Sequence, residues 1–319
     1  MSLLEQVRVR CNAVADRAGF VQIDTDRIAS YAASLPIDRL RNPEVDPGCH
    51  YLGHGVETIA FFMTLNTVNF GSGYFPHLKK RPGMSGYFTI ASSLNDYFRE
   101  NGPLSAEKLA QISPEACARL FGQDAESEPI RELMQLFATA LGDLGLHLLN
   151  RFEGKFDALV ESAQCSADHL VRLLCEMRYF NDVESYDELQ VPFFKRAQIT
   201  AADLSLAFDD QGPGQFNDLH HLTMFADNLV PHVLRIDNVL RYNDALAARI
   251  DQAELIPAGS TEEVELRACA VHAVELLVSE LASLGQRLTS MEVDNLLWNR
   301  GQQSEYKDFP RHRTRSVFY

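Results

Sequence analysis

Along most of this chain, apolar residues recur at intervals of three and four, and this periodicity restricts the fold more than any other feature. Within 262–285, the apolar positions with this spacing are Val271, Val274, Val278 and Leu281. That interval puts side chains on one face of an α-helix, which has about 3.6 residues per turn. Ser260, followed by the acidic residues Glu262 and Glu263, has the pattern of a helix N-terminus. The sequence therefore predicts a long helix over 262–285.

The same periodicity extends over much of the chain. Further helices are predicted at 3–17, 55–67, 86–100, 105–121, 128–150, 152–162 and 166–178, and from Leu219 to Leu240. Strand signals are weak, and the two candidates for short strands are Tyr87–Ile90 and Leu189–Val191. Loops are short, and no internal repeat or low-complexity linker divides the sequence. We therefore expect an all-α fold, with one compact helical domain over residues 1–319.

The overall charge bears on the class of ligand. The 319 residues carry a formal net charge of −15. Proteins that bind a nucleic-acid backbone usually present a basic face, so a protein of the DNA-duplex-binding class is disfavoured. A small ligand is favoured, and an acidic pocket would suit a cationic one. Solubility alone explains the acidic balance equally well.

Composition also bears on the compartment. No apolar run reaches the ~20 residues that a transmembrane helix needs. The N-terminus, Met1–Gln6, lacks the basic start and apolar run of a signal peptide. The six cysteines are scattered without a C-x-x-C pair, as expected of reduced core thiols. We expect a cytoplasmic protein without a membrane partner.

The segment Leu222-Thr223-Met224-Phe225-Ala226-Asp227 ends on a carboxylate within an apolar helix face. Burying an unpaired charge is costly, so Asp227 calls for an explanation. Pro231 either kinks the helix here or marks a restart with Asp227 as the N-cap, and an ordinary cap would be sufficient. Alternatively, Asp227 is a fixed anion beside a reacting sugar carbon. There it would stabilise an oxocarbenium-like transition state or position a water.

Two basic segments are candidates for anion recognition. Lys195 and Arg196 lie side by side within the apolar stretch 193–199, where a solvated pair at a helix start is an equally good explanation. The C-terminal segment Tyr306–Tyr319 is basic and also aromatic, which is unusual for a disordered tail. We expect it to dock on the protein and bring cations to a pocket.

A metal site and a cofactor are not indicated. His50 and His54 have the spacing of a zinc-binding pair, but the glutamate of the H-E-x-x-H motif is absent and Gly53 weakens the helix that this motif needs. No other histidine has a convincing set of partner ligands. His50 remains a candidate hydrogen-bonding partner for a ligand.

Several segments in combination resemble one known family. These are Asn66–Phe70, Phe194–Ile199, Ala202–Leu204, Leu222–Asp227, Val230-Pro231, Glu263–Arg267, Leu297-Trp298 and Pro310–Tyr319. Together they resemble the queuosine salvage protein family, the queuosine 5′-phosphate N-glycosylases, from about residue 50 onward. Two positions depart from the family pattern. Gly71-Ser72-Gly73 stands where some members carry aromatic residues, and Asn228 stands where a tyrosine is usual.

The resemblance implies a helical fold related to the helix-hairpin-helix DNA glycosylases. It implies hydrolysis of the glycosidic bond of queuosine 5′-monophosphate, with release of queuine. The catalytic aspartate of the family corresponds to Asp227, and its accompanying lysine corresponds to Lys195. Queuine is a 7-deazaguanine and has no N7 to protonate. Catalysis must therefore rely on stabilising positive charge at the sugar, which a carboxylate can do.

Other roles implied by the resemblance rest on position in the sequence. Lys195 would orient Asp227 or hold the ribose phosphate, and the further candidates for the phosphate are Arg196, Arg313 and Arg315. Phe70 and Phe225 would stack on the base. Asp294 would pair with the secondary amine of queuine, which is cationic near neutral pH.

Three other functions remain open from the sequence. A DNA-repair glycosylase would share the fold and the aspartate, but the net charge of −15 argues against it. A carrier of queuine or of a modified nucleotide would bind without turnover and would have no need of Asp227. A structural scaffold would leave the buried carboxylate without a purpose.

Overall fold

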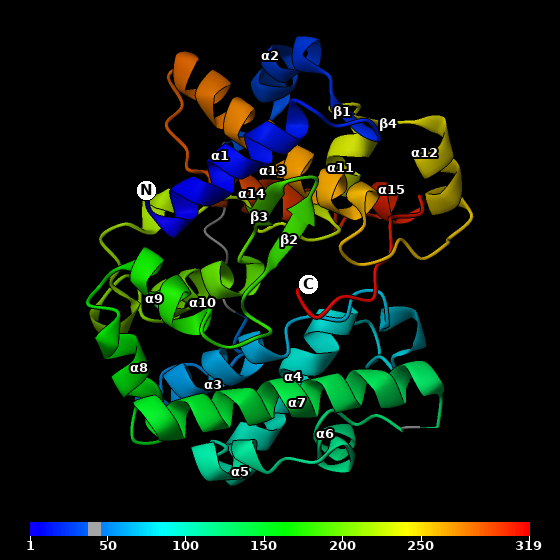
Figure 1. Ribbon diagram of the computed structural model, residues 1–319. Coiled ribbons are helices and arrows are strands. Elements are labelled where there is room, and N and C mark those ends of the chain that lie inside the picture. The colour runs from blue at the N-terminus through cyan, green and yellow to red at the C-terminus, as the bar shows by residue number, and fades with distance from the viewer. Residues whose placement is uncertain (38–45, 125) are drawn as a thin grey trace.

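A computed structural model describes residues 1–37, 46–124 and 126–319 of the chain and is mostly helical. The helices form two lobes, one above the other in Figure 1. The terminal lobe combines helices from both ends of the chain: α1 (Leu3–Ala15), α2 (Thr25–Ser34), α11 (Val230–Ile236), α12 (Asp244–Asp251), α13 (Thr261–Ser283), α14 (Ser290–Arg300) and α15 (Ser304–Lys307). The central lobe contains α3 (Val56–Thr67), α4 (Gly86–Asn101), α5 (Ala106–Ala110), α6 (Pro114–Leu120), α7 (Glu128–Arg151) and α8 (Phe156–Ser162).

The terminal lobe is built around α13. This helix begins after Ser260, whose side chain accepts a hydrogen bond from the Glu263 amide, so the helix predicted over 262–285 is confirmed. Helices α1, α2, α11 and α14 pack on it. The apolar stripe of α1 (Leu4, Val7, Cys11 and Val14) is buried. Helices α1 and α2, at the start of the chain, therefore bury their apolar faces against α13, which lies within about the last sixty residues.

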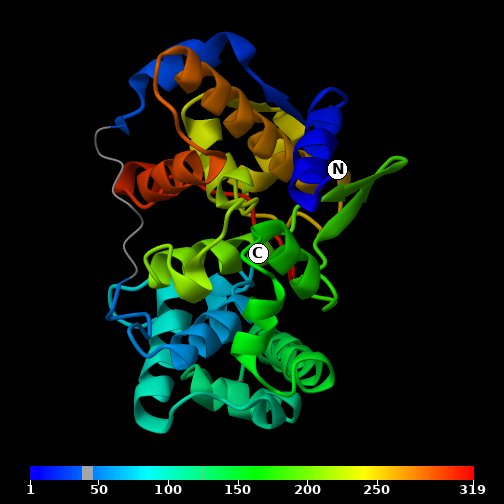
Figure 2. The ribbon, with the colours of Figure 1, turned by 90° about the vertical axis from the view of Figure 1, so that its left-hand side faces the viewer.

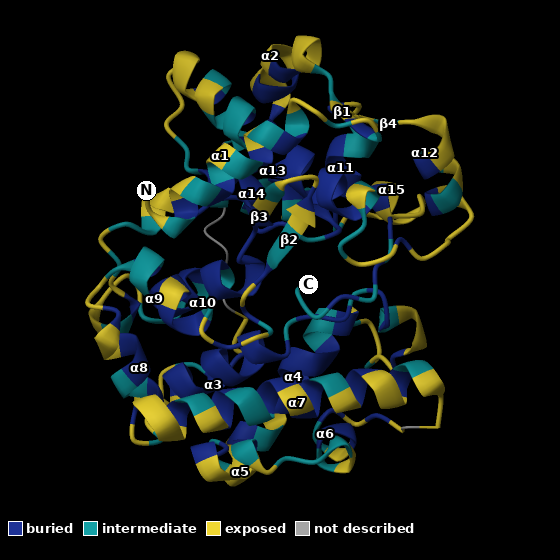
Figure 3. Cartoon of the chain, in the orientation of Figure 1, coloured by how far each residue is buried: buried dark blue, intermediate teal, exposed yellow. Residues whose placement is uncertain are grey.

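The central lobe contains the longest of the described helices, α7, which runs across the lobe above α5 and α6 in Figure 1. Gly145 of α7 allows α5 to approach closely, because a Cβ there would lie 2.3 Å from the Ala110 nitrogen. Helix α3 is buried on nearly all sides. Helices α9 (Ala167–Leu174) and α10 (Lys195–Ala207) lie between the two lobes, as the side view in Figure 2 shows. Buried apolar residues from Leu4 to Tyr306 form one connected cluster, and Figure 3 shows how burial concentrates on the facing sides of the helices.

Strands are few among the described residues and form two antiparallel pairs. β1 (Val21–Ile23) pairs with β4 (Leu240–Tyr242), and β2 (Val183–Tyr186) pairs with β3 (Leu189–Pro192). The strand predicted at 189–191 is confirmed as part of β3. The strand predicted at 87–90 is wrong. Those residues form the first turn of α4, because the Ser85 side chain accepts a hydrogen bond from the Phe88 amide and starts a helix.

Two predicted helices are interrupted. The helix predicted over 105–121 is two short ones, because Ser113 caps a new helix that begins at Pro114. The helix predicted from 219 to 240 is wrong over most of its length. It consists of a 3₁₀ turn, η4 (Leu219–His221), an irregular stretch over 222–229, and the short helix α11. Two more 3₁₀ turns, η2 (Phe75–His77) and η3 (Gly212–Gly214), lie in loops.

Side chains from other helices hold the irregular stretch 222–229. Gln198 of α10 accepts from the Thr223 amide at 2.8 Å, and Asp294 of α14 accepts from the Phe225 amide at 3.1 Å. Arg267 of α13 donates to the Ala226 carbonyl at 3.0 Å. These bonds replace those of a helix and satisfy the buried main chain. Asp227 is therefore presented by an irregular segment, not by a helix face.

After α15, the chain turns back and ends between the two lobes, where the C label stands in Figure 1. His312, Thr314 and Tyr319 are buried, which confirms the expected docking of this segment. The carbonyl of Arg313 accepts from the Ile256 amide at 2.9 Å, and that of Tyr319 accepts from the Gly71 amide at 2.9 Å. Within the described residues, no helix is both long enough and apolar enough to cross a membrane.

Candidate active site

A cavity of about 520 Å³ lies between the two lobes. That size accommodates a small organic ligand. Its charged lining residues are Lys80, Lys195, Asp203, Asp227, Asp294, Lys307 and Arg311, and its aromatic ones include Phe70, Phe75, Tyr87, Phe88, Phe225, Trp298 and Tyr319. Both lobes, α10 and the C-terminal segment thus contribute to one pocket.

Asp227 lines this pocket and also accepts hydrogen bonds from the main chain at the start of a helix. Its Oδ1 accepts hydrogen bonds from the amides of Leu229 (2.8 Å) and Val230 (3.2 Å), at the start of α11. Oδ2 has no hydrogen bond to the part of the chain that the structure describes. The N-cap residue of α11 is Leu229, so the N-cap predicted at Asp227 is wrong by two positions, but the Asp227 side chain still satisfies two amides at the helix start while it lines the pocket. One carboxylate oxygen fixes the orientation, and the other is available to a ligand.

Lys195, the first residue of α10, also lines the pocket and is only 6% exposed. Burial lowers the pKa of Lys195 to about 8, and the charges of Asp227 and Asp294 oppose part of that shift. No ion pair within 4.0 Å joins Lys195 to a carboxylate of the described residues, so the attraction acts over a longer distance. The buried ammonium therefore retains donors that a ligand can use.

Two more carboxyl groups face the same space. Burial and the charge of Asp227 raise the pKa of Asp294 well above its ordinary value. Asp203 of α10 accepts a hydrogen bond from the Asn66 side chain at 2.8 Å. Burial raises the pKa of Asp203 to about 6, while Asn66 and the charge of Lys195 lower it. Asp203 was not among the predicted site residues, and its only signal was its place in the Ala202–Leu204 motif.

His50 and Tyr87 form a neutral polar pair at the pocket. His50 Nε2 lies 3.0 Å from the Tyr87 hydroxyl and Nδ1 lies 3.1 Å from the Asp46 carbonyl. A carbonyl only accepts, so Nδ1 donates and the Tyr87 hydroxyl donates to Nε2. Burial lowers the pKa of His50, which favours the neutral ring. Tyr87 was not among the predicted site residues, because its apolar neighbours suggested a strand.

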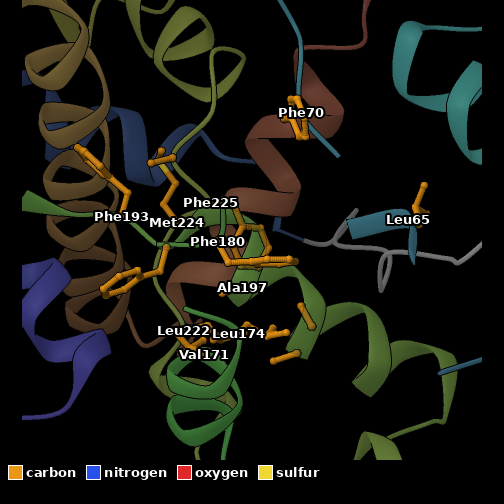
Figure 4. Close-up of a cluster of buried hydrophobic side chains, with 14 of the residues drawn as sticks. Leu65, Phe70, Val171, Leu174, Phe180, Phe193, Ala197, Leu222, Met224 and Phe225 are labelled. Atoms are coloured by element: carbon orange, nitrogen blue, oxygen red, sulfur yellow. The ribbon is translucent and has the colours of Figure 1, made fainter. Parts of the chain in front are cut away.

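The two predicted stacking residues, Phe70 and Phe225, both line the pocket. Figure 4 shows Phe225 above an apolar cluster that includes Phe180, Ala197 and Leu174. Two further aromatic residues of the lining, Phe88 and Trp298, contact each other edge to face with ring centroids 6.5 Å apart. The pocket thus has several apolar ring faces beside its charged groups.

Three predicted anion-binding arginines lie outside the lining. Arg196 is buried, and its guanidinium donates to main-chain carbonyls, including Asn66 at 3.0 Å and Val317 at 2.8 Å. Arg313 donates to the Ala253 carbonyl, and Arg315 pairs with Glu132 at 3.3 Å. The cations that do line the pocket, besides Lys195, are Lys80, Lys307 and Arg311, which are exposed.

The model of the queuosine salvage protein family matches residues 49–319. The chain belongs to this family. Among its relatives are proteins named queuosine 5′-phosphate N-glycosylase/hydrolase. The one from Sphaerobacter thermophilus is 37% identical over 312 residues, which cover 96% of this chain and 95% of the relative. The one from Dictyostelium discoideum is 32% identical, covering 82% and 78%. The one from Mus musculus is 30% identical, covering 74% and 72%.

Most of the motifs that resemble the queuosine salvage family contribute to the pocket wall. Lining residues from these motifs are Asn69, Phe70, Lys195, Ile199, Asp203, Phe225, Asp227, Trp298, Arg311 and Tyr319. Two motifs are exceptions. Val230-Pro231 is buried in α11 and Glu263–Arg267 is buried in α13, and neither lines the pocket.

Proposed function

We propose that this chain hydrolyses the N-glycosidic bond of queuosine 5′-monophosphate and releases queuine for salvage into tRNA modification. The relatives' names point to this reaction. The observation that carries the proposal is the half-buried Asp227 carboxylate in the pocket. Two main-chain amides fix its Oδ1, and a buried lysine lies nearby. A carrier of queuine would not need this arrangement.

The chemistry of the substrate assigns Asp227 its role. Because the 7-deazapurine base lacks N7, its departure is assisted mainly by stabilising the sugar cation that remains. An oriented carboxylate does this, and it acts more strongly where it is partly withdrawn from water. Asp227 would stabilise the oxocarbenium-like transition state and orient the attacking water. Lys195 would orient Asp227 or contact the ribose phosphate.

The remaining lining residues suggest how the substrate lies. Phe225 and Phe70 offer ring faces to the base, and Trp298 adds another. Asp294 would pair with the cationic amine of queuine, because a cation beside it favours the ionised carboxylate despite the raised pKa. His50 would act through Tyr87, whose hydroxyl oxygen can still accept a hydrogen bond from the ligand.

The direct test is to incubate the purified protein with queuosine 5′-monophosphate and to detect free queuine by mass spectrometry. Asp227→Asn is the control. Release of queuine by the wild type but not by the variant supports a glycosidase that works through this aspartate. A protein that binds the nucleotide without releasing queuine is a carrier, and that outcome removes the catalytic assignments.

The pH dependence of kcat/KM should carry the signature of Lys195. Burial lowers its pKa to about 8, so its positive charge is present below that pH and is lost above it. We therefore expect kcat/KM to fall as pH rises through that value. Lys195→Arg keeps the charge and should abolish this alkaline limb, even if it lowers the rate. An unchanged alkaline limb in Lys195→Arg would assign the limb to another group.

Arg311 is our candidate for binding the ribose phosphate, and Lys307 and Lys80 also belong to the pocket lining. Arg311→Ala should raise KM for the nucleotide by about tenfold to a hundredfold, the effect of removing one charged hydrogen bond. The nucleoside queuosine, which lacks the phosphate, should be processed equally well by variant and wild type. Arg313→Ala is the matched control, because that arginine belongs to the same segment but lies outside the lining. An equal loss with both substrates would exclude the phosphate role.

We also propose the features that the composition, the sequence patterns and the resemblance lead us to expect. The chain would form a single domain over residues 1–319, with a helical arrangement related to that of helix-hairpin-helix DNA glycosylases, and would act in the cytoplasm without a cofactor. Its net charge of −15 supports a nucleotide over a DNA duplex as substrate. Excision of a base from a lesion-bearing duplex would count against this choice.

A further inference from the structure

A buried ion pair lies just behind the pocket. Asp182 and Arg267 are 2% and 0% exposed, and they form two parallel contacts, Nη1–Oδ1 at 3.0 Å and Nη2–Oδ2 at 2.6 Å. Neither residue lines the pocket. Burying two charges is unfavourable unless every remaining polar group finds a partner. The partners of this pair are therefore informative.

Each member of the pair binds the main chain next to a candidate catalytic residue. Arg267 Nε donates to the carbonyl of Ala226, the residue before Asp227, at 3.0 Å. Asp182 Oδ2 accepts from the amide of Lys195 itself at 3.3 Å. The ion pair thus links the segment that presents Asp227 to the first residue of α10.

The guanidinium of Arg267 has little freedom to move. It lies over the ring of Phe193 at 3.9 Å and over that of Tyr319 at 4.8 Å, measured from Cζ to the ring centroids. Glu263, one turn earlier on α13, is 3.5 Å away and buried. A planar group held between two rings and bonded on its edges keeps its orientation. The Arg267 guanidinium therefore holds the Ala226 carbonyl in a fixed position.

The segment that carries Asp227 depends on the Arg267 guanidinium for its conformation. Residues 222–229 belong to no helix or strand, so their main chain is held by side chains. Of these bonds, the one from Arg267 lies closest in sequence to Asp227. Without it, the buried Ala226 carbonyl would lose its partner and the segment could shift.

We propose that Asp182 and Arg267 are positioning residues that together set the placement of the Asp227 carboxylate relative to the Lys195 ammonium. The proposal rests on the proposed function. It also accounts for the buried Glu263–Arg267 motif, which the pocket itself does not use.

The test is Asp182→Asn, which keeps the size of the side chain and removes its charge. A displacement of about 1 Å at a reacting group can lower the rate by a hundredfold, so we expect a loss in kcat of this order with KM nearly unchanged. Asp237→Asn is the matched control. Asp237 pairs with Arg300 at 3.1 Å in the same lobe, and neither residue lines the pocket. The control should lower the melting temperature and leave kcat unchanged.

A double-mutant cycle of Asp182→Asn and Asp227→Asn distinguishes an effect of Asp182 on Asp227 from a general loss of structure. If Asp182 acts through Asp227, then Asp182→Asn should cost little further kcat in the Asp227→Asn background. Losses that multiply in the double variant would overturn the proposal, as would wild-type kcat in a folded Asp182→Asn protein.

Folding of the variants is checked by circular dichroism and thermal melting. If Asp182→Asn does not fold, Arg267→Lys, which retains the positive charge, is tested in the same way. Failure of both variants to fold would assign the pair to stability alone and overturn the proposal. If the wild-type protein itself releases no queuine, the proposed function has failed, which is a different outcome.

Discussion

Asp227→Asn should lower kcat for queuosine 5′-monophosphate by about a thousandfold, at the upper end of what one preorganised electrostatic contact contributes. The amide oxygen of asparagine can still accept from Leu229 and Val230, so the start of α11 should remain capped. What disappears is the negative charge that the proposed mechanism puts beside the sugar. Single-turnover release of queuine, followed by mass spectrometry, measures the loss in the chemical step.

The control for Asp227→Asn is Asp218, another aspartate that accepts hydrogen bonds at the start of a helix. Asp218 accepts from the Asp168 amide at 3.2 Å and from the Ser166 hydroxyl at 2.8 Å, at the start of α9, and does not line the pocket. Asp218→Asn should lower the melting temperature and leave kcat intact. Near wild-type turnover in folded Asp227→Asn would remove this residue from the mechanism.

Gly73→Ala should destabilise the protein by roughly 3 kcal/mol, the upper end of the usual cost of overpacking. A Cβ at this position would lie 2.3 Å from the Thr314 oxygen and 2.8 Å from the Arg315 nitrogen. Main-chain atoms cannot rotate away as a side chain can, so the C-terminal segment would have to move. Arg311 and Tyr319 of that segment line the pocket, and KM should therefore rise together with the loss of stability.

Thermal unfolding and steady-state kinetics of Gly73→Ala measure both effects. Gly19→Ala is the control, because nothing lies within 4 Å of a Cβ built there. A Gly73→Ala protein with wild-type melting temperature and KM would show that the segment does not depend on this close contact.

The parts of the fold that could be predicted are those held by interactions between residues close together in the sequence. Helices such as α7 and α13 carry their signal locally, in periodic apolar residues and in caps such as Ser260. The stretch 222–229 has the same apolar periodicity but is not helical, because Gln198, Asp294 and Arg267 hold its main chain. These partners lie far away in the sequence, so no local pattern could reveal them.

In the candidate site, too, the residues with a local sequence signal could be predicted, and those placed by distant contacts could not. Asp227 and Lys195 stood out because a charge in an apolar segment needs an explanation, and both line the pocket. In the basic C-terminal segment, composition could not indicate which arginine reaches the pocket. That depends on where the segment crosses the protein, which contacts such as that of Gly73 with Thr314 determine. Arg311 lines the pocket, whereas Arg313 and Arg315 do not.

The docking of the C-terminal segment has a consequence for protein synthesis. The pocket wall includes residues from His50 to Tyr319, and the early helix α1 packs on α13. As the nascent chain leaves the ribosome, α1 emerges long before its partner and keeps an apolar face exposed in the meantime. A premature stop shortly before Tyr319 would keep Asp227 and Lys195 in the chain, but it would remove the ring that packs on Arg267 and leave the pocket wall incomplete. The pocket wall is therefore complete only after translation has passed its last residues.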